Sequence, residues 1–201
     1  MVRFIAVVGG SGSGKSWLAD RIRAAYGAAA GHLSLDDFYR DLGHLTPEQR
    51  AVVNFDDPAS IDWDALRAVM LALESGGAAG LPAYDFATHT RKPRGQPFPF
   101  RPVIVVEGLW LLHPEWLREK FTHSLFVDCP ESLRLQRRID RDVASRGRTE
   151  ASVREQFAAH VEPMHALYVQ PQREWSQDVI ESPADEETIT KLLESWEIGK
   201  A

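Results

Sequence analysis

The sequence predicts an α/β protein with three α/β/α layers, in which helices cover both faces of a mostly parallel sheet. Short, continuous apolar runs alternate along the chain with longer segments of helical period, as strands and helices do in such folds. A glycine-rich turn separates the first apolar run from the first helical segment, which is where a phosphate-binding loop would lie. These two observations predict the architecture and point to a nucleotide ligand.

Composition places this fold in an ordinary globular protein. The chain has 201 residues, 44% of them hydrophobic and 26% charged, and we expect a single domain over residues 1–201. The net charge of −6 argues against nucleic acid as a partner. Its single cysteine, Cys129, excludes an internal disulfide and is interpreted as an inert strand-end residue. Because no apolar run has the length of a signal peptide or a membrane span, we expect no membrane partner and a cytoplasmic location.

Five apolar runs predict the strands. Each is short and bounded by turn or helix signals, as is typical of strands buried on both faces. The predicted strands are Phe4–Val8, His32–Leu35, Val103–Val106, Ser124–Val127 and Asp178–Ile180.

Segments of 3.6-residue period predict the helices. The second of them follows Asp62 as N-cap and ends at Gly76 and Gly77. Trp17 and Trp63 are expected to pack within their helices. Between the helix after Asp62 and the third strand, residues 80–100 carry several prolines and predict an irregular excursion or β-ribbon. The predicted helices are Lys15–Tyr26, the segment from Trp63, Glu131–Ala144, Ala151–Leu167, Pro171–Ser176 and Glu186–Trp196.

The glycine-rich turn, GGSGSGKS, fits the pattern G-x-x-x-x-G-K-[ST] between a buried strand and a helix. Its glycines let backbone N–H groups converge on phosphate oxygens at a helix N-terminus. We expect Lys15 to reach the β- and γ-phosphates of a nucleoside triphosphate and Ser16 to ligate Mg²⁺; the alternative is a glycine-rich turn without a ligand. The residues predicted to bind the phosphates are Gly9, Gly10, Ser11, Gly12, Ser13, Gly14, Lys15 and Ser16.

Acidic residues follow two of the predicted strands. Asp36 and Asp37 come after the second strand, and Glu107 follows the third. In an open α/β sheet the ligand crevice lies beyond the carboxyl ends of the strands. A carboxylate there can accept a proton from an attacking hydroxyl or hold a metal. The alternative for the aspartate pair is a solvated turn cap.

A basic segment follows the fourth strand. Arg134 and Arg138 are interpreted as part of a solvated helix face. The glycine between Arg146 and Arg148 instead indicates a mobile loop with two forked donors, which can close over phosphates. We therefore expect residues 134–165 to form a helical lid.

The sequence resembles the uridine kinase (uridine–cytidine kinase) family of P-loop kinases over about residues 3–181. The stretches that carry the resemblance, besides the phosphate loop, are LDDFYRDL, NFDDPASID, PAYDFATHTR, VIVVEGLW and RRIDRDVASRGRT. The resemblance implies that ATP, with Mg²⁺, phosphorylates the 5′-hydroxyl of uridine or cytidine. It also implies a homo-oligomer, often a tetramer.

The resemblance further implies roles for individual residues. Asp36 would be the catalytic base, acting with Lys15, Arg141 and Arg146, and Asp56 would hold the ribose hydroxyls. The nucleoside side would comprise Asp36, Tyr39, Asp56, Tyr84, His89, Arg141 and Gln156. Arg146 and Arg148 would contact the ATP phosphates, and the metal ligands would be Ser16, Asp36 and Glu107.

Several departures leave the substrate open. Leu35 stands where the family usually has a polar residue, Asp37 replaces a common serine, and residues 160–169 are similar to a stretch of nicotinamide riboside kinases. The alternatives are a related kinase for nicotinamide riboside, pantothenate or ribulose phosphate, and a nucleotide-binding regulator that uses no acceptor. His160 and His165 are interpreted as surface or packing residues, and Trp110 as equally suited to the core and the pocket.

Overall fold

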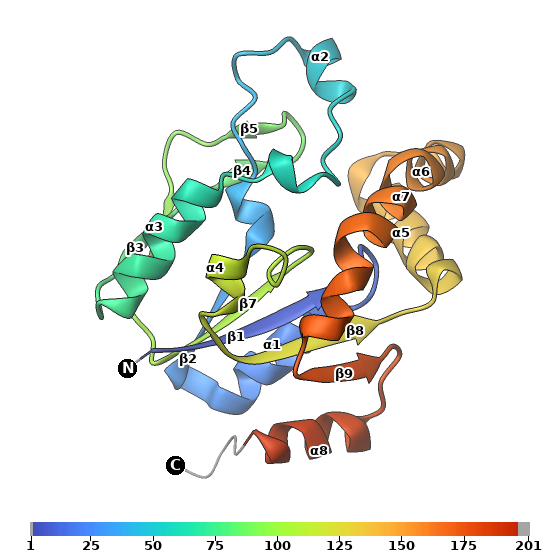
Figure 1. Ribbon diagram of the computed structural model, residues 1–201. Helices are drawn as coiled ribbons and strands as arrows, with labels where there is room; N and C mark the ends of the chain where they lie inside the picture. Colours follow the sequence, from blue (N-terminus) through green and yellow to red (C-terminus); the bar gives the residue numbers. More distant parts are fainter. Residues whose placement is uncertain (1, 197–201) are drawn as a thin grey trace.

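The computed structural model of the protein describes residues 2–196. Its central sheet has the strand order β2-β7-β1-β8-β9, and every neighbouring pair is parallel (Figure 1). The predicted three-layer α/β fold is confirmed. The strands are β1 (Arg3–Gly9), β2 (Ala30–Ser34), β7 (Val103–Gly108), β8 (Phe121–Asp128) and β9 (Asp178–Glu181).

The sheet is buried on both faces because successive side chains of each strand point in opposite directions. In β1, Phe4 and Val8 join one apolar cluster, whereas Ile5 and Val7 join the other. Helices α3 and α4 cover the first face, and α1 and α8 cover the second (Figure 1). The bounds are α1 (Lys15–Tyr26), α3 (Trp63–Glu74), α4 (Glu115–Arg118) and α8 (Glu186–Ser195).

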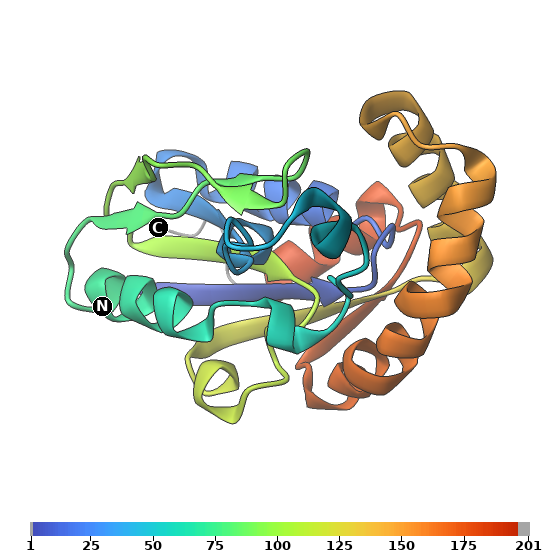
Figure 2. The ribbon, with the colours of Figure 1, turned by 90° about the horizontal axis from the view of Figure 1, so that it is seen from above.

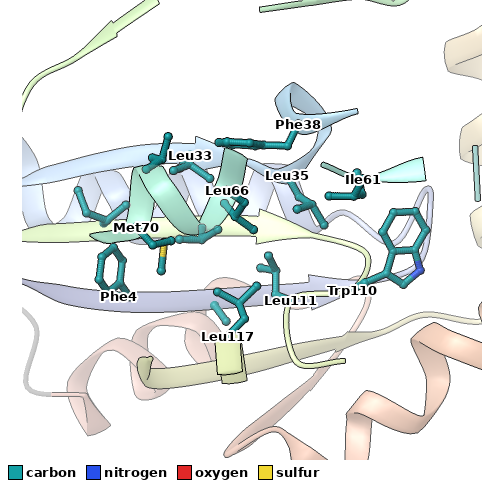
Figure 3. Packing of buried hydrophobic residues seen from close by; sticks show 14 of the residues in the cluster. Phe4, Leu33, Leu35, Phe38, Ile61, Leu66, Met70, Trp110, Leu111 and Leu117 are labelled. Atoms are coloured by element: carbon teal, nitrogen blue, oxygen red, sulfur yellow. The ribbon is translucent and has the colours of Figure 1, made fainter. Parts of the chain in front are cut away.

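The first cluster is the larger of the two and extends to the end of the sheet where the site lies. Figure 3 shows Leu66 and Met70 of α3 packed against side chains of the sheet, with Trp110 at the far end of the cluster. Trp110 is 1% exposed. It therefore belongs to the core, which settles a position that the sequence left open.

Several helix boundaries follow from capping. The Asp62 side chain accepts the Ala65 N–H at 3.0 Å and so begins α3, as predicted. The sequence reading missed α2 (Pro47–Ala51), which begins with a capping box in which Thr46 and Gln49 each accept the other's backbone N–H. The strand predicted to reach Leu35 ends at Ser34, since a 3₁₀ turn, η2 (Leu35–Phe38), starts there.

Beyond the carboxyl ends of the strands stands a helical arm, seen at the right of Figure 2. Its first helix, α5 (Glu131–Arg146), ends at Gly147, whose φ of 63° is left-handed and favours glycine. The arm then returns through α6 (Glu150–Gln156), η4 (Phe157–Val161), α7 (Glu162–Met164), η5 (His165–Val169) and η6 (Gln170–Trp175). The π-helical turns η4 and η5 were not predicted; Pro163 and Pro171, which lack an N–H, follow them closely and interrupt the α-helical ladder.

The excursion between α3 and β7 is a β-ribbon in two short parts. Strands β3 (Ala79–Leu81) and β6 (Gln96–Phe98) form its base, and β4 (Tyr84–Asp85) and β5 (Thr90–Arg91) form its outer part. Arg91 fastens the ribbon to the core side: its backbone N–H donates to Asp41 Oδ1 at 3.0 Å, and its guanidinium pairs with Asp62 Oδ2 at 3.0 Å. In Figure 2 the ribbon lies alongside the sheet, and the helical arm lies beyond the carboxyl ends of its strands.

Between residues 2 and 196, none of the helices combines the length and the apolar character needed to cross a membrane. The cytoplasmic location and the assignment of one domain to residues 1–201 stay predictions.

Candidate active site

The phosphate loop connects β1 to α1, and α5 of the helical arm packs against it. Gly12 and Gly14 have φ angles of 81° and 94°, a left-handed backbone that glycine adopts without strain. A Cβ at Gly12 would also lie 2.4 Å from the Arg134 carbonyl oxygen. The loop therefore owes its shape to glycines at positions where both the backbone and the neighbouring helix exclude a side chain.

One cavity opens on the outer side of this loop, and we call it the donor cavity. It encloses about 550 Å³ between residues 12–18 of the loop and α1 and residues 180–184 at the end of β9 and just after it. Arg137, which sequence reasoning did not single out, ties these walls together: its Nη1 donates to Ser13 O at 3.1 Å and to Ser182 Oγ at 2.9 Å. The spacing of basic residues on α5 carried no signal for this role.

A second cavity, the acceptor cavity, lies between the loop, the ribbon and the helical arm. Its volume is about 930 Å³. Lys15 and Arg141 line both cavities, so the two spaces meet at these side chains. The site residues predicted from the sequence that line the acceptor cavity are Ser11, Lys15, Asp36, Tyr39, Asp56, Tyr84, His89, Arg141, Arg146, Arg148 and Gln156.

Asp36 reaches this cavity from η2, whose start is fixed by Ser34 Oγ accepting the Asp36 N–H at 3.3 Å. Burial raises the pKa of the Asp36 carboxyl, and the nearby Glu107 carboxylate raises it further. Lys15, Arg146 and Arg141 act in the opposite direction. The result is a carboxylate with more affinity for a proton than an ordinary aspartate.

The neighbouring Asp37 does not line either cavity. Burial, with the charges of Asp36 and Glu107, raises its pKa to about 6. The two adjacent aspartates therefore differ in access to the cavity while sharing one crowded acidic environment.

Glu107 ends β7 beneath the loop and is 5% exposed. Its Oε2 accepts from Ser16 Oγ at 3.1 Å, and its Oε1 accepts from Ser34 Oγ at 2.7 Å. In the described part of the chain, no three His, Cys, Asp or Glu side chains are grouped so that they could hold a metal ion. The nearby hydroxyl and carboxylate oxygens of Ser16, Asp36 and Glu107 are nevertheless of the type that Mg²⁺ takes when phosphates and water complete its shell.

Aromatic side chains form the end of the acceptor cavity nearest the ribbon. Tyr39 and Tyr84 lie 5.3 Å apart between ring centroids, and Phe55 and His89 are stacked at 4.3 Å. Burial and the charges of Arg50 and Arg146 lower the pKa of His89, so its imidazole is neutral at pH 7. Phe55 was missed in the sequence, although it stands inside the NFDDP stretch that carried the resemblance.

Asp56 supplies a carboxylate between the aromatic end and the arginines. Burial raises its pKa, and the opposing charge of Arg138 is the largest of the effects that lower it. Its backbone N–H donates to Asn54 Oδ1 at 3.1 Å, which holds the turn that presents the side chain. The carboxylates that line the acceptor cavity are Asp36 from η2, Asp56 from the turn after α2, and Asp85 from the ribbon.

The arginines of the helical arm gather around one fully buried carboxylate, Asp142. Its oxygens lie 3.6 Å from Arg138, 2.8 Å from Arg141, 3.5 Å from Arg146 and 4.0 Å from Arg148. Sequence reasoning quoted the motif that contains Asp142 without assigning it a role. Its burial could not be read from the sequence, because no local pattern distinguishes it from Asp140 on the same helix.

The expectation that Arg134 and Arg138 form a solvated face is wrong. Arg134 is 2% exposed and pairs with Glu162 at 2.7 Å. Arg138 is 7% exposed, and it donates to Ser11 Oγ at 2.8 Å and to Gln156 Oε1 at 2.9 Å. Both guanidinium groups are enclosed because the returning part of the arm and the phosphate loop pack over this face of α5.

Other predicted residues are placed as follows. Gly9 and Gly10 line neither cavity, and Arg146 and Arg148 line the acceptor cavity and not the donor cavity. Arg148 also contacts Gln156 through a side-chain hydrogen bond.

The residues expected to have no catalytic role are placed mainly by burial. Cys129 is buried at the end of β8, and His165 is a buried packing residue. Trp17, expected to pack within its helix, is 51% exposed and faces the donor cavity.

The chain is similar in sequence to kinases of known name. The chain is 45% identical over 177 residues to a uridine kinase of Chloroflexus aggregans, a match that covers 88% of this chain and 84% of that one. It is 37% identical to a uridine kinase of Brevibacillus brevis, covering 97% and 91% of the two chains.

Solved structures share the fold at low sequence identity. They include phosphoribulokinase from Rhodobacter spheroides, with a TM-score of 0.66, 18% identity and coverage of 92% of this chain and 72% of that one. A D-glycerate 3-kinase from Cryptococcus neoformans has a TM-score of 0.57 at 19% identity, covering 83% and 79%.

The model of one protein family spans residues 4–188, from the first strand to the beginning of α8. That span includes both cavities and the loop between them. The chain therefore belongs to the phosphoribulokinase / uridine kinase family.

Proposed function

We propose that the protein transfers the γ-phosphoryl group of ATP to the 5′-hydroxyl of uridine or cytidine. One observation carries the proposal: a phosphate-loop cavity and an aromatic, carboxylate-bearing cavity meet at Lys15 and Arg141, with Asp36 beside the junction. A kinase for a small acceptor needs two such adjoining sites, whereas a nucleotide switch needs only the first. The relatives from Chloroflexus aggregans and Brevibacillus brevis, which match most of this length, are uridine kinases.

On this proposal, residues 12–16 hold the ATP phosphates with backbone N–H groups and the Lys15 ammonium. Asp36 accepts the proton of the nucleoside 5′-hydroxyl as its oxygen attacks the γ-phosphorus. The raised pKa of Asp36 suits a proton acceptor, since a more basic carboxylate takes the proton with a smaller free-energy cost. Lys15 and Arg141 stand where charge spreads in the transition state.

The far end of the acceptor cavity has the chemistry to recognise a pyrimidine nucleoside. Asp56 would accept hydrogen bonds from the vicinal ribose hydroxyls, and Gln156 would reach the nucleoside beside Arg138. Tyr39, Tyr84 and the stacked Phe55–His89 pair offer π-faces and polar ring edges to the base. Because the His89 imidazole is neutral, it can both donate and accept at the base edge.

We also propose Mg²⁺ as the cofactor, with Ser16, Asp36 and Glu107 as its protein side. This proposal is supported by the oxygen groups close to Glu107. The Glu107 carboxylate accepts a hydrogen bond from the Ser16 hydroxyl, and its charge raises the pKa of Asp36. When bound, Mg²⁺ would neutralise phosphate charge and hold the β- and γ-oxygens in place.

The test is an acceptor panel. Purified protein with ATP and Mg²⁺ is given uridine, cytidine, nicotinamide riboside, pantothenate and ribulose 5-phosphate, and kcat/KM is measured for each. We expect uridine or cytidine to exceed the other acceptors by at least about 100-fold, since leaving the site's buried polar groups unpaired is costly. If another acceptor has a higher kcat/KM than uridine and cytidine, that acceptor is the substrate. If no acceptor changes the rate of ATP hydrolysis, the protein is a nucleotide-binding regulator and not a kinase.

The homo-oligomer implied by the family resemblance is a further proposal. Sedimentation velocity over a range of protein concentrations tests it, and a monomer at every concentration would contradict it.

A further inference from the structure

We propose that Trp17 is the residue that holds the base of the phosphoryl donor, by stacking its indole on the base in the donor cavity. This inference rests on the proposed function and deepens it, since it assigns recognition of the donor base to one side chain. It starts from the exposure of Trp17, which is 51% although the residue stands in the first turn of α1. A large aromatic ring left open beside a phosphate loop is the observation to explain.

The position of Trp17 fits the base and not the phosphates. The donor cavity is lined by Gly12–Ser16, where the phosphates would lie, and by the wall of residues 180–184, in which Ile180, Pro183 and Ala184 are apolar. Glu181 and Ser182 are the polar members of that wall, and Trp17 is the aromatic ring among the residues that line this cavity. A nucleotide whose phosphates occupy the loop would extend its base into the rest of this cavity, beside Trp17 and the apolar side chains of the wall.

Two contacts connect the Trp17 ring to α8. The Arg21 guanidinium lies 5.8 Å from the centre of the Trp17 ring, and Arg21 also pairs with Glu186 at the start of α8. Arg21 and Glu186 are exposed, so the pair adds little to stability. Its effect is positional: it links the helix that carries Trp17 to the segment that carries Pro183 and Ala184.

The cavity has room for this ligand. Its volume, about 550 Å³, is in the range of roughly 300–1,000 Å³ that binding sites for small molecules occupy. Stacking of a base on an aromatic side chain contributes enough to binding to change affinity by roughly 10-fold per contact. Replacing Trp17 should therefore weaken the binding of phosphoryl donors that have a base and leave the binding of base-free polyphosphates unchanged.

The experiment uses the full chain in four forms: the unmodified protein, Trp17→Leu, Trp17→Phe and Trp175→Leu. Trp175 is the matched control, since it is 41% exposed and has an arginine, Arg118, 4.6 Å from its ring centre, but lines neither cavity. Calorimetry with Mg²⁺ gives the dissociation constants of ATP and of inorganic tripolyphosphate. Steady-state assays with uridine give KM for each substrate and kcat.

We expect Trp17→Leu to raise the dissociation constant of ATP about 10-fold and to change that of tripolyphosphate less than about 2-fold. KM for ATP should rise, and KM for uridine should stay the same. Trp17→Phe should recover most of the ATP affinity because it keeps a π-face. Trp175→Leu should match the unmodified protein in every measurement.

The inference would be overturned if Trp17→Leu weakened the binding of ATP and of tripolyphosphate by the same factor. The ring would then only support the phosphate loop. It would also fail if Trp17→Leu bound ATP with the affinity of the unmodified protein, because the ring would then contribute nothing to recognition of the base. Both results leave the proposed function intact when the unmodified protein phosphorylates uridine. An unmodified protein that bound ATP but phosphorylated no acceptor would overturn the proposed function and leave the stacking result to stand by itself.

Discussion

The two cavities that meet at Lys15 are built in different ways. The loop side of the donor cavity comes from one unbroken stretch of chain, and two of its glycines have backbone angles that other residues adopt with strain. The acceptor cavity is assembled from side chains of the loop, η2, the turn after α2, the ribbon and the helical arm. Backbone geometry defines the first site, and the packing of distant elements defines the second.

This difference predicts how each site responds to change. A substitution in the loop alters the backbone that every donor needs, whereas a substitution in the acceptor cavity removes one contact from a scaffold that remains. The chemistry of transfer depends on the few residues that belong to both sides. The four predictions below test this contrast in order of expected effect.

The largest effect is expected at the junction. Asp36→Asn should lower kcat by about 1,000-fold, because the amide cannot take the proton of the acceptor hydroxyl. The dissociation constant of ATP, measured by calorimetry, should change little. Asp37→Asn is the control, and its kcat should fall by less than about 10-fold. Equal losses in the two variants would contradict the assignment of Asp36 as the base.

The second prediction concerns the helical arm. Asp142→Asn should lower the free energy of unfolding by about 2 kcal/mol, because it leaves four arginines without their buried counter-charge. Urea unfolding measures this, with Asp140→Asn on the exposed side of the same helix as control, for which we expect a change below about 0.5 kcal/mol. An Asp142→Asn protein as stable as the control variant would show that the arginines do not need this carboxylate.

The third prediction tests the aromatic end of the acceptor cavity. His89 has a φ of 55°, which asparagine also tolerates, so His89→Asn removes the ring with little backbone strain. KM for uridine should rise about 10-fold while KM for ATP stays unchanged. Thr88→Asn, on the same ribbon but outside the cavity wall, should leave both constants unaltered. A rise in KM for ATP in His89→Asn would break the separation between the two cavities.

The smallest effect is a pH dependence of stability at Asp37. Its folded-state pKa, about 6, lies above the ordinary aspartate value, so its contribution to stability is fully present below pH 4 and is lost as pH rises through 6. Asp37→Asn should therefore stabilise the protein at pH 8 by about 1 kcal/mol, after allowance for solvent screening, and have no effect at pH 3.5. Urea unfolding at the two pH values measures this, and a loss of stability at pH 8 would contradict the raised pKa.

The same contrast explains how far the sequence could be interpreted. The loop, the strands of the sheet and the caps depend on neighbouring residues, so local patterns were sufficient to predict Lys15, Ser16 and the N-cap Asp62. Family resemblance collected the residues of the acceptor cavity, since their positions in the chain are far apart.

What the sequence could not predict depends on which polar faces become enclosed. Arg134 and Arg138 have the spacing of a solvated helix face, and only the return of the arm over α5 buries them. Asp142 is similar, because nothing local distinguishes it from the exposed Asp140. Trp17 is the opposite case: an aromatic residue in a helix predicts packing, whereas here it stands at a cavity.

The wall shared by the two cavities has a thermodynamic consequence. Lys15 and Arg141 face both spaces, so the charge and position that they adopt for one occupant are also those that the other occupant meets. Donor and acceptor are then coupled ligands, and whatever factor ATP contributes to the affinity for the nucleoside, the nucleoside must return to ATP. The affinity measured for either substrate therefore depends on the concentration of the other.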